Sequence, residues 1–165
     1  GQMGLQFLRA DLARDRDVLR RFNTEYFAWI GDAVRERFGL SLTDLMSGSI
    51  ADYVDGALDE LCDAAPPYGV FYLAFDGDTA VGMGELRRVR DLVGEIKRIY
   101  VSKTVRGAGV GAKMLAQLMD DARWLSGGYS RHRPVHDLRP SALRSGWVPR
   151  HSRLCRGRSA ASSTP

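Results

Sequence analysis

The hydrophobic period of this chain changes once, near Gly69, and that change limits the folds it can adopt. Before it, apolar residues recur at spacings of three and four over Val18–Phe38 and again over about Ser41–Ala64. Such spacings predict two amphipathic helices, the first with Asp11 at its N-cap and the second stopped by Pro66-Pro67. The N-terminal part of the chain is therefore expected to be mainly helical.

After Gly69 the pattern is that of consecutive strands. Val70–Phe75 is apolar and aromatic, Asp76-Gly77-Asp78 predicts a hairpin turn, and Ala80–Val89 and Glu95–Val101 are two further strand-like runs. Leu5–Arg9 alternates briefly and predicts a strand before the helices. Because strands joined by short turns pair antiparallel, we expect this part of the chain to form an antiparallel meander, so that the chain combines helices with a sheet.

A glycine loop joins the last of these strands to a final helix. It reads Arg106-Gly107-Ala108-Gly109-Val110-Gly111, and the apolar face of the helix runs on to Ala122. Glycines leave backbone N–H groups uncovered beside the positive end of the helix dipole, which favours an anion such as phosphate. The spacing fits neither a Walker loop nor the dinucleotide fingerprint. A simple capping turn is the plainer interpretation, but three alternating glycines behind an arginine exceed what a turn needs.

Arg106, Gly109 and Gly111 match the signature Arg/Gln-x-x-Gly-x-Gly/Ala, and in this the chain resembles the GNAT superfamily of acyl-CoA-dependent N-acetyltransferases. The similarity covers roughly residues 5–128, since the strand, the two helices and the meander stand in the family's order. It implies an α/β (α+β) fold with a mixed, mostly antiparallel central sheet flanked by helices, and a GNAT-like acetyl-CoA-binding core over residues 1–130. It also implies transfer of an acetyl group from acetyl-CoA, as co-substrate and without a metal, to a primary amine of a small molecule or peptide, by direct attack in a ternary complex.

The resemblance also assigns the cofactor-binding residues. The loop and first helical turn would hold the pyrophosphate of CoA through backbone N–H groups, with the Arg106 side chain adding charge. These residues are Arg106, Gly107, Ala108, Gly109, Val110, Gly111 and Ala112. In the family the preceding strand splays from its neighbour at a bulge, and its main chain pairs with the pantetheine arm and the acyl carbonyl. That role falls on Ile99, Tyr100 and Val101.

An attacking amine must also lose a proton, so a general base is expected. Glu95 matches the strand position that supplies the base in some family members, and we take it as the candidate catalytic residue. Glu85, on the neighbouring strand, is a rival for the same role. A solvated glutamate without any catalytic role is the plainer interpretation of either position.

Residues 131–165 form an atypical C-terminal region that departs from the family. They are rich in Arg, Ser and Pro, a composition typical of disorder, and no tyrosine follows Tyr129, although the family commonly uses a later one to protonate the departing thiolate. Read one nucleotide later, plausible codons for Val135–Arg150 spell Ala-Leu-Tyr and then Gly-Phe, as in the family. One hypothesis is therefore that this tail is a frameshift product that begins near Arg131.

Charge separates this tail from the body of the chain. Residues 1–128 hold 16 Lys and Arg against 19 Asp and Glu, whereas residues 129–165 hold eight Arg against Asp137 alone. The net charge of +4 therefore comes from the tail, and nucleic acid is an unlikely partner of the body. A nucleic-acid binder that uses the tail ranks last among the alternatives. An acyl-CoA-binding module with little or no catalytic activity is the main alternative to an enzyme.

The sequence does not support several further classes of protein: membrane-spanning, secreted, disulfide-bonded and metal-binding. No stretch approaches the roughly 20 apolar residues of a membrane span, and no signal-peptide pattern is present, so we expect a soluble, cytoplasmic protein without a membrane partner. Cys62 and Cys155 are expected to be free thiols. Pro134 separates His132 from His136, so we expect no metal site. A homodimer is an open alternative, because proteins that resemble this chain are frequently dimers.

Overall fold

The computed structural model describes residues 4–90, 93–127 and 148–150. The chain divides into two compact units. One is helical and runs from Ala10 to Asp63, and the other is built on a sheet and contains Gly1–Arg9 and Ala64–Pro165. The predicted boundary at residue 130 lies outside the described residues.

The helical unit begins with the long helix α1, Leu12–Phe38. The expected N-cap is confirmed, because Asp11 Oδ1 accepts hydrogen bonds from the N–H groups of Ala13 and Arg14 at 2.9 and 3.2 Å. The helix ends at Gly39, whose φ of 67° lies in the left-handed region that favours glycine.

The prediction of one continuous helix over Ser41–Ala64 is wrong. The structure has a short helix α2, Leu42–Met46, and a separate helix α3, Ile50–Leu61. Ser47 takes a φ of 56° between them, which a helix cannot continue through. Ser49 then caps α3, because its Oγ accepts the Asp52 N–H at 3.1 Å.

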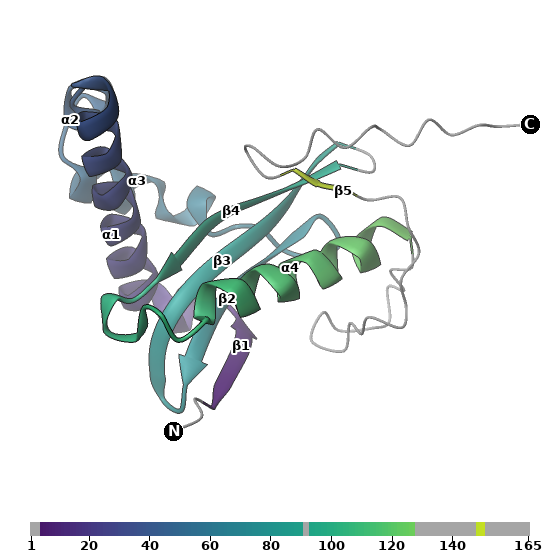
Figure 1. Ribbon diagram of the computed structural model, residues 1–165. Helices are drawn as coiled ribbons and strands as arrows, with labels where there is room; N and C mark the ends of the chain where they lie inside the picture. The colour runs from purple at the N-terminus through teal and green to yellow at the C-terminus, as the bar shows by residue number, and fades with distance from the viewer. Residues whose placement is uncertain (1–3, 91–92, 128–147, 151–165) are drawn as a thin grey trace, which may run out of the picture. The chain divides into compact units, whose positions relative to one another are not determined.

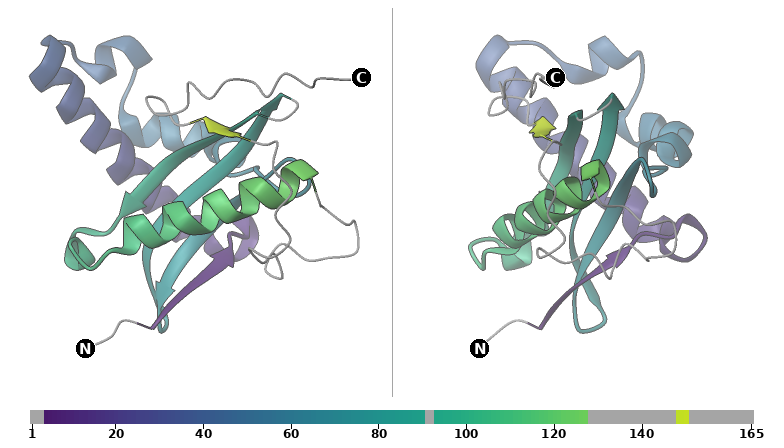
Figure 2. Two further views of the ribbon diagram at one scale, coloured as in Figure 1. Left: turned by 45° about the vertical axis from the view of Figure 1, so that its right-hand side comes forward. Right: turned by 90° about the vertical axis from the view of Figure 1, so that its right-hand side faces the viewer.

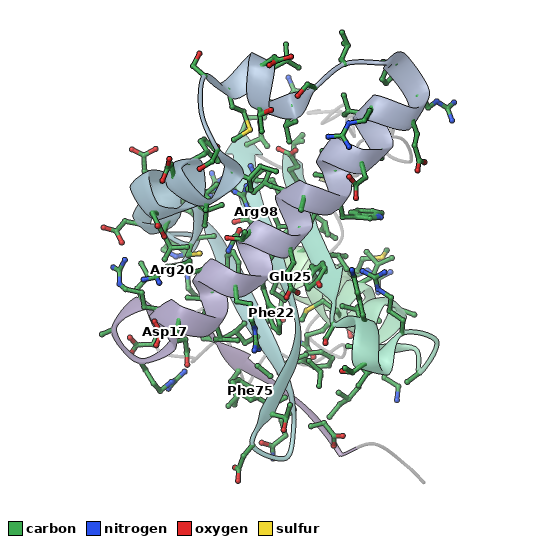
Figure 3. All side chains as sticks on the ribbon, turned by 90° about the vertical axis from the view of Figure 1, so that its left-hand side faces the viewer. Asp17, Arg20, Phe22, Glu25, Phe75 and Arg98 are labelled. Atoms are coloured by element: carbon green, nitrogen blue, oxygen red, sulfur yellow. The ribbon has the colours of Figure 1, made fainter. Side chains whose placement is uncertain are left out.

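Helices α1 and α3 pack against each other through apolar and charged contacts. The rings of Phe27 and Tyr53 meet edge to face with centroids 5.3 Å apart. Arg20 pairs with Asp55, and Arg16 Nη2 lies 2.7 Å from Asp59 Oδ1 at an exposed position. Figure 3 shows Asp17, Arg20, Phe22 and Glu25 following one another along α1.

The other unit is a five-stranded sheet in the order β1-β2-β3-β4-β5. Its strands are β1 Leu5–Arg9, β2 Gly69–Asp76, β3 Thr79–Arg90, β4 Val93–Val101 and β5 Val148–Arg150. The first four pair antiparallel, which confirms the expected meander, and β5 lies parallel to β4 along its edge (Figure 1). The predicted mixed, mostly antiparallel sheet is therefore confirmed.

Helix α4, Val110–Gly127, lies across one face of this sheet, as the views in Figures 1 and 2 agree. The core beneath it is apolar and comes from β2, β3, β4 and α4. Its buried members are Val70, Tyr72, Ala74, Val81, Leu86, Ile96, Val110, Met114, Leu118 and Ala122. Among the described residues, no helix is long and apolar enough to cross a membrane.

Gly84 sets how closely α4 approaches the sheet. A Cβ atom built on Gly84 would lie 2.7 Å from Met114 Cγ and 3.1 Å from Leu118 Cδ1. The helix therefore touches the backbone of β3 at this residue, and a side chain there would push the two elements apart.

Candidate functional site

Strand β4 carries a β-bulge halfway along its pairing with β3. Glu85 faces Lys97, and two residues further back Met83 faces Tyr100, so Gly84 alone lies opposite two residues, Arg98 and Ile99. One extra residue on one strand is what defines a bulge. The bulge that the family resemblance implied is therefore present, and it consists of Arg98 and Ile99.

The bulged residue Arg98 has a φ of 52°, a left-handed conformation that is unusual for a side chain of this size. Such a conformation costs on the order of 1–3 kcal/mol and persists only where the surroundings hold it. Here Arg98 Nη2 lies 2.6 Å from Glu85 Oε1, and Arg87 Nη2 lies 3.4 Å from Glu85 Oε2. Glu85 is wholly buried, so the charges of Arg98 and Glu85 meet in a region of low dielectric constant.

The end of β4 presents its main chain in a defined direction. Ser102 N–H donates to Val81 C=O at 2.8 Å, so Ser102 and, two residues earlier, Tyr100 point their backbone groups toward β3. By the same alternation Ile99 and Val101 point theirs to the opposite edge. In the described residues β5 pairs with β4 only from Val93 to Glu95, so these two residues lie beyond that pairing.

The glycine loop follows directly. A 3-10 turn, η1 at Lys103–Val105, leads into Arg106, and Gly107 and Gly109 take φ values of 88° and 80°. A Cβ atom on either glycine would meet no heavy atom within 4 Å. The two positions therefore need glycine for their backbone conformation and not for space.

The first turn of α4 leaves donors without acceptors inside the helix. The helix begins at Val110, and its first intrahelical hydrogen bond runs from Lys113 N–H to Gly109 C=O at 3.0 Å. The N–H groups of Val110, Gly111 and Ala112 precede that bond and have no intrahelical partner. Together with the positive end of the helix dipole they form an arrangement suited to an anion.

The Arg106 side chain lies back over the strand. Its Nε donates to Val101 C=O at 3.3 Å, and its guanidinium lies 5.9 Å from the centroid of the Tyr100 ring. Both contacts hold the loop against the end of β4. The Arg106 side chain is exposed, so its positive charge lies at the surface beside the loop.

The two candidate bases differ in burial and in their neighbours. Glu95 is half-buried on β4, lies opposite Arg87 in the β3 register, and faces away from α4 because its neighbour Ile96 belongs to the core under that helix. Burial raises the pKa of the Glu85 carboxyl, while the charges of Arg98 and Arg87 act in the opposite direction. Glu85 is thus shielded from solvent and lies beside two guanidinium groups, whereas Glu95 is partly exposed.

A buried polar cluster beneath α4 was not predicted. Tyr72 O–H donates to Asp121 Oδ2 at 2.5 Å, and Gln117 Nε2 donates to Asp121 Oδ1 at 3.1 Å. Asp121 is wholly buried, and this burial raises its pKa to about 7 although both hydrogen bonds act to lower it. Asp121 stands three residues after Leu118, on the apolar face of the helix, and that spacing was the available signal.

The sequence predicts no metal site, and it predicts that both cysteines are free thiols. Among the described residues no group of three or more His, Cys, Asp or Glu side chains is arranged to hold a metal ion. His132, His136 and Cys155 lie outside the described residues, and Cys62 is a buried free thiol.

The sequence matches the family model described as Acetyltransferase (GNAT) family over residues 34–132, which is more than half of the chain. That segment contains the bulged strand, the glycine loop and the first helical turn described above. The chain therefore belongs to the GNAT acetyltransferase family. No curated protein sequence matches it.

Several solved structures are similar to the chain at low sequence identity. A GNAT-family acetyltransferase from Staphylococcus aureus is 17% identical, with a TM-score of 0.46, over 70% of this chain and 65% of its own. The PaiA N-acetyltransferase of Thermoplasma acidophilum, solved with coenzyme A, is 17% identical with a TM-score of 0.47, over 70% and 69%. Glucosamine-6-phosphate N-acetyltransferase from Arabidopsis thaliana is 15% identical with a TM-score of 0.47, over 74% and 76%. The chain thus spans slightly less than two thirds of the Staphylococcus protein.

Proposed function

We propose that the chain binds acetyl-CoA through its glycine loop and transfers the acetyl group to a primary amine of a small molecule or peptide. The observation that carries this proposal is the junction of β4 and α4. Two glycines at positive φ open onto a helix whose first N–H groups have no intrahelical acceptor. A diphosphate offers the charge and the oxygen acceptors that such a junction suits.

In this proposal the cofactor follows the chain from Ile99 to Ala112. The pyrophosphate contacts the backbone from Arg106 to Ala112, and the pantetheine arm pairs with the outward main-chain groups of Ile99 and Val101. Tyr100 lies between them and supports the Arg106 guanidinium through its ring.

Transfer proceeds by direct attack in a ternary complex. The amine nitrogen forms a bond to the thioester carbon, the carbon–sulfur bond breaks, and the proton lost by the amine ends on the sulfur of CoA. A backbone N–H aimed at the carbonyl oxygen stabilises the negative charge that develops there, typically by about 3 kcal/mol. Glu95 is the proposed general base, because it is half-buried on the same strand as that donor. A cytoplasmic location belongs to the same proposal.

Titration and turnover test the proposal together. Acetyl-CoA and CoA should both bind by calorimetry, and thiol release from acetyl-CoA should increase with an amine from a panel of amino acids, polyamines and peptides. Glu95→Gln should lower the turnover number while CoA affinity is kept. A folded protein that binds neither acetyl-CoA nor CoA would refute the proposal.

The alternative function, an acyl-CoA-binding module, gives a different result in the same experiment. Its motivation is the atypical sequence after residue 130, where the family's tyrosine is missing. Binding of both cofactors without amine-dependent thiol release across the panel would favour this alternative over the transferase.

A further inference from the structure

We propose that Glu85 and Arg98 form a positioning pair that holds the β4 bulge and thereby directs the Ile99 amide toward the thioester of bound acetyl-CoA. This inference rests on the proposed function and adds two residues to it. Neither of them is expected to touch the reacting atoms.

The bulge decides which main-chain groups β4 presents at its outer edge. On the near side of the bulge Glu85 faces Lys97, and on the far side Met83 faces Tyr100. Without the extra residue Met83 would face Ile99, and the Ile99 backbone groups would turn toward β3. The extra residue therefore moves Ile99 and Val101 from the inner to the outer edge of the strand.

The same extra residue determines to which face of the sheet the side chains after it point. Ile99 and Val101 pack against the core under α4, whereas Arg98 and Tyr100 point to the other face. A slip of one residue would reverse this arrangement for every residue up to the loop. The bulge thus determines which side chains of β4 pack against the core and which of its backbone groups lie at the outer edge of the strand.

The ion pair is what holds Arg98 in its left-handed conformation. No glycine relieves the backbone at this position, and the Arg98 side chain, 11% exposed, reaches Glu85 at 2.6 Å. Glu85 is wholly buried on β3, and its side chain lies on the face of the sheet opposite α4, because its neighbour Gly84 is the residue that contacts Met114. A carboxylate that is charged while buried is stabilised by a paired cation, and only a bulged strand places Arg98 on the same face as Lys97.

Glu85→Gln is the central variant, because it keeps the shape and removes the charge that holds Arg98. The turnover number should fall about 100-fold, as for loss of one oxyanion donor. The affinity for CoA without an acetyl group should change less than about twofold, because the glycine loop is untouched. Arg98→Lys keeps a cation within reach of Glu85 and should lose less turnover than Glu85→Gln.

A spectroscopic measurement separates positioning from general stability. In the wild type the Ile99 amide signal should move further with acetyl-CoA than with CoA, and in Glu85→Gln this difference should vanish. Asp59→Asn is the matched control, since it breaks another arginine–carboxylate pair, at 2.7 Å but exposed, and should behave as wild type.

Two outcomes overturn the inference. One is a folded Glu85→Gln protein that keeps both wild-type turnover and the acetyl-dependent Ile99 shift. The other is an equal loss of affinity for CoA and acetyl-CoA that follows the folded fraction, which would mean a structural role alone. Failure of the proposed function looks different, because the wild type itself would then bind neither cofactor.

Discussion

Single residues fix the site through their backbone conformations more than through their side chains. Gly107 and Gly109 stand at positive φ with open space around them, and Arg98 stands there with its side chain held in an ion pair. Glycine reaches this region without strain, whereas other residues need an external hold. The loop and the bulge therefore respond differently to substitution.

Gly109→Ala should weaken CoA binding. An alanine at a φ of 80° is strained by about 1–2 kcal/mol, so we expect the loop to relax. The first N–H groups of α4 would then no longer point together toward the bound pyrophosphate. Calorimetry should show an affinity loss of about fivefold or more. Gly56→Ala is the control: Gly56 also has open space but no positive φ, and alanine suits its place within α3. Equal affinities for the two variants would contradict this account.

Asp121→Asn should make the protein more stable at alkaline pH. The folded-state pKa of Asp121, about 7, lies above its ordinary value. The stabilisation linked to its protonated form is therefore complete below the ordinary pKa and is lost as the pH rises through about 7. An asparagine carries no charge and can still accept the Tyr72 hydrogen bond.

The measurement is the free energy of unfolding in urea at pH 5 and pH 8. The advantage of Asp121→Asn should grow by about 1–3 kcal/mol between these values. A difference that is the same at both pH values would show that Asp121 does not change its protonation in this range.

Among the elements, the junction of β3, β4 and α4 is the most important for the geometry of the proposed site. Gly84 lies opposite the bulge on one side and against Met114 of α4 on the other. A substitution at Gly84 therefore affects the packing of β4 and of α4 together.

Gly84→Ala should destabilise the sheet unit by about 1–3 kcal/mol, because its Cβ would lie 2.7 Å from Met114 Cγ. The same change should be less costly when Met114 is already alanine. Urea unfolding of the two single variants and the double variant gives the coupling energy between the sites. Strictly additive effects would mean that the contact with Met114 does not limit the approach.

The order of strands and helices was predictable, and the bulge position was not. The change of period at Gly69 and the turn at Asp76–Asp78 gave the meander, because both signals are local. The place of the bulge depends on Glu85 from another strand, and no local pattern shows that pairing. The break between α2 and α3 lies at Ser47-Gly48. These two residues are a local turn signal, but the apolar residues on both sides keep the helical spacing, so the spacing alone did not show the break.

For the whole molecule, every residue of the proposed cofactor site belongs to the sheet unit. The bulged strand, the loop and α4 follow one another between Val93 and Gly127. The tail after residue 130 contributes nothing to this list. Cofactor binding and acetyl transfer can therefore depend on different parts of the chain.

Restoring the family's reading frame after Arg131 should raise turnover without changing CoA affinity. With plausible codons the shifted frame would supply an Ala-Leu-Tyr segment, whose tyrosine would protonate the departing thiolate as in the family. The check is to sequence the gene across these codons and to compare thiol release and CoA binding of the two chains. An uninterrupted frame with this same tail in close relatives would refute the frameshift hypothesis.

The missing side chain at Gly84 has one more consequence. With nothing between β3 and Met114, a displacement of the helix that starts at the phosphate loop is passed directly to the strand that carries Glu85. In the proposed complex, the residues that contact the phosphates and those that contact the thioester therefore belong to elements that pack directly on each other. We expect a substitution that changes one set of contacts to change the other as well.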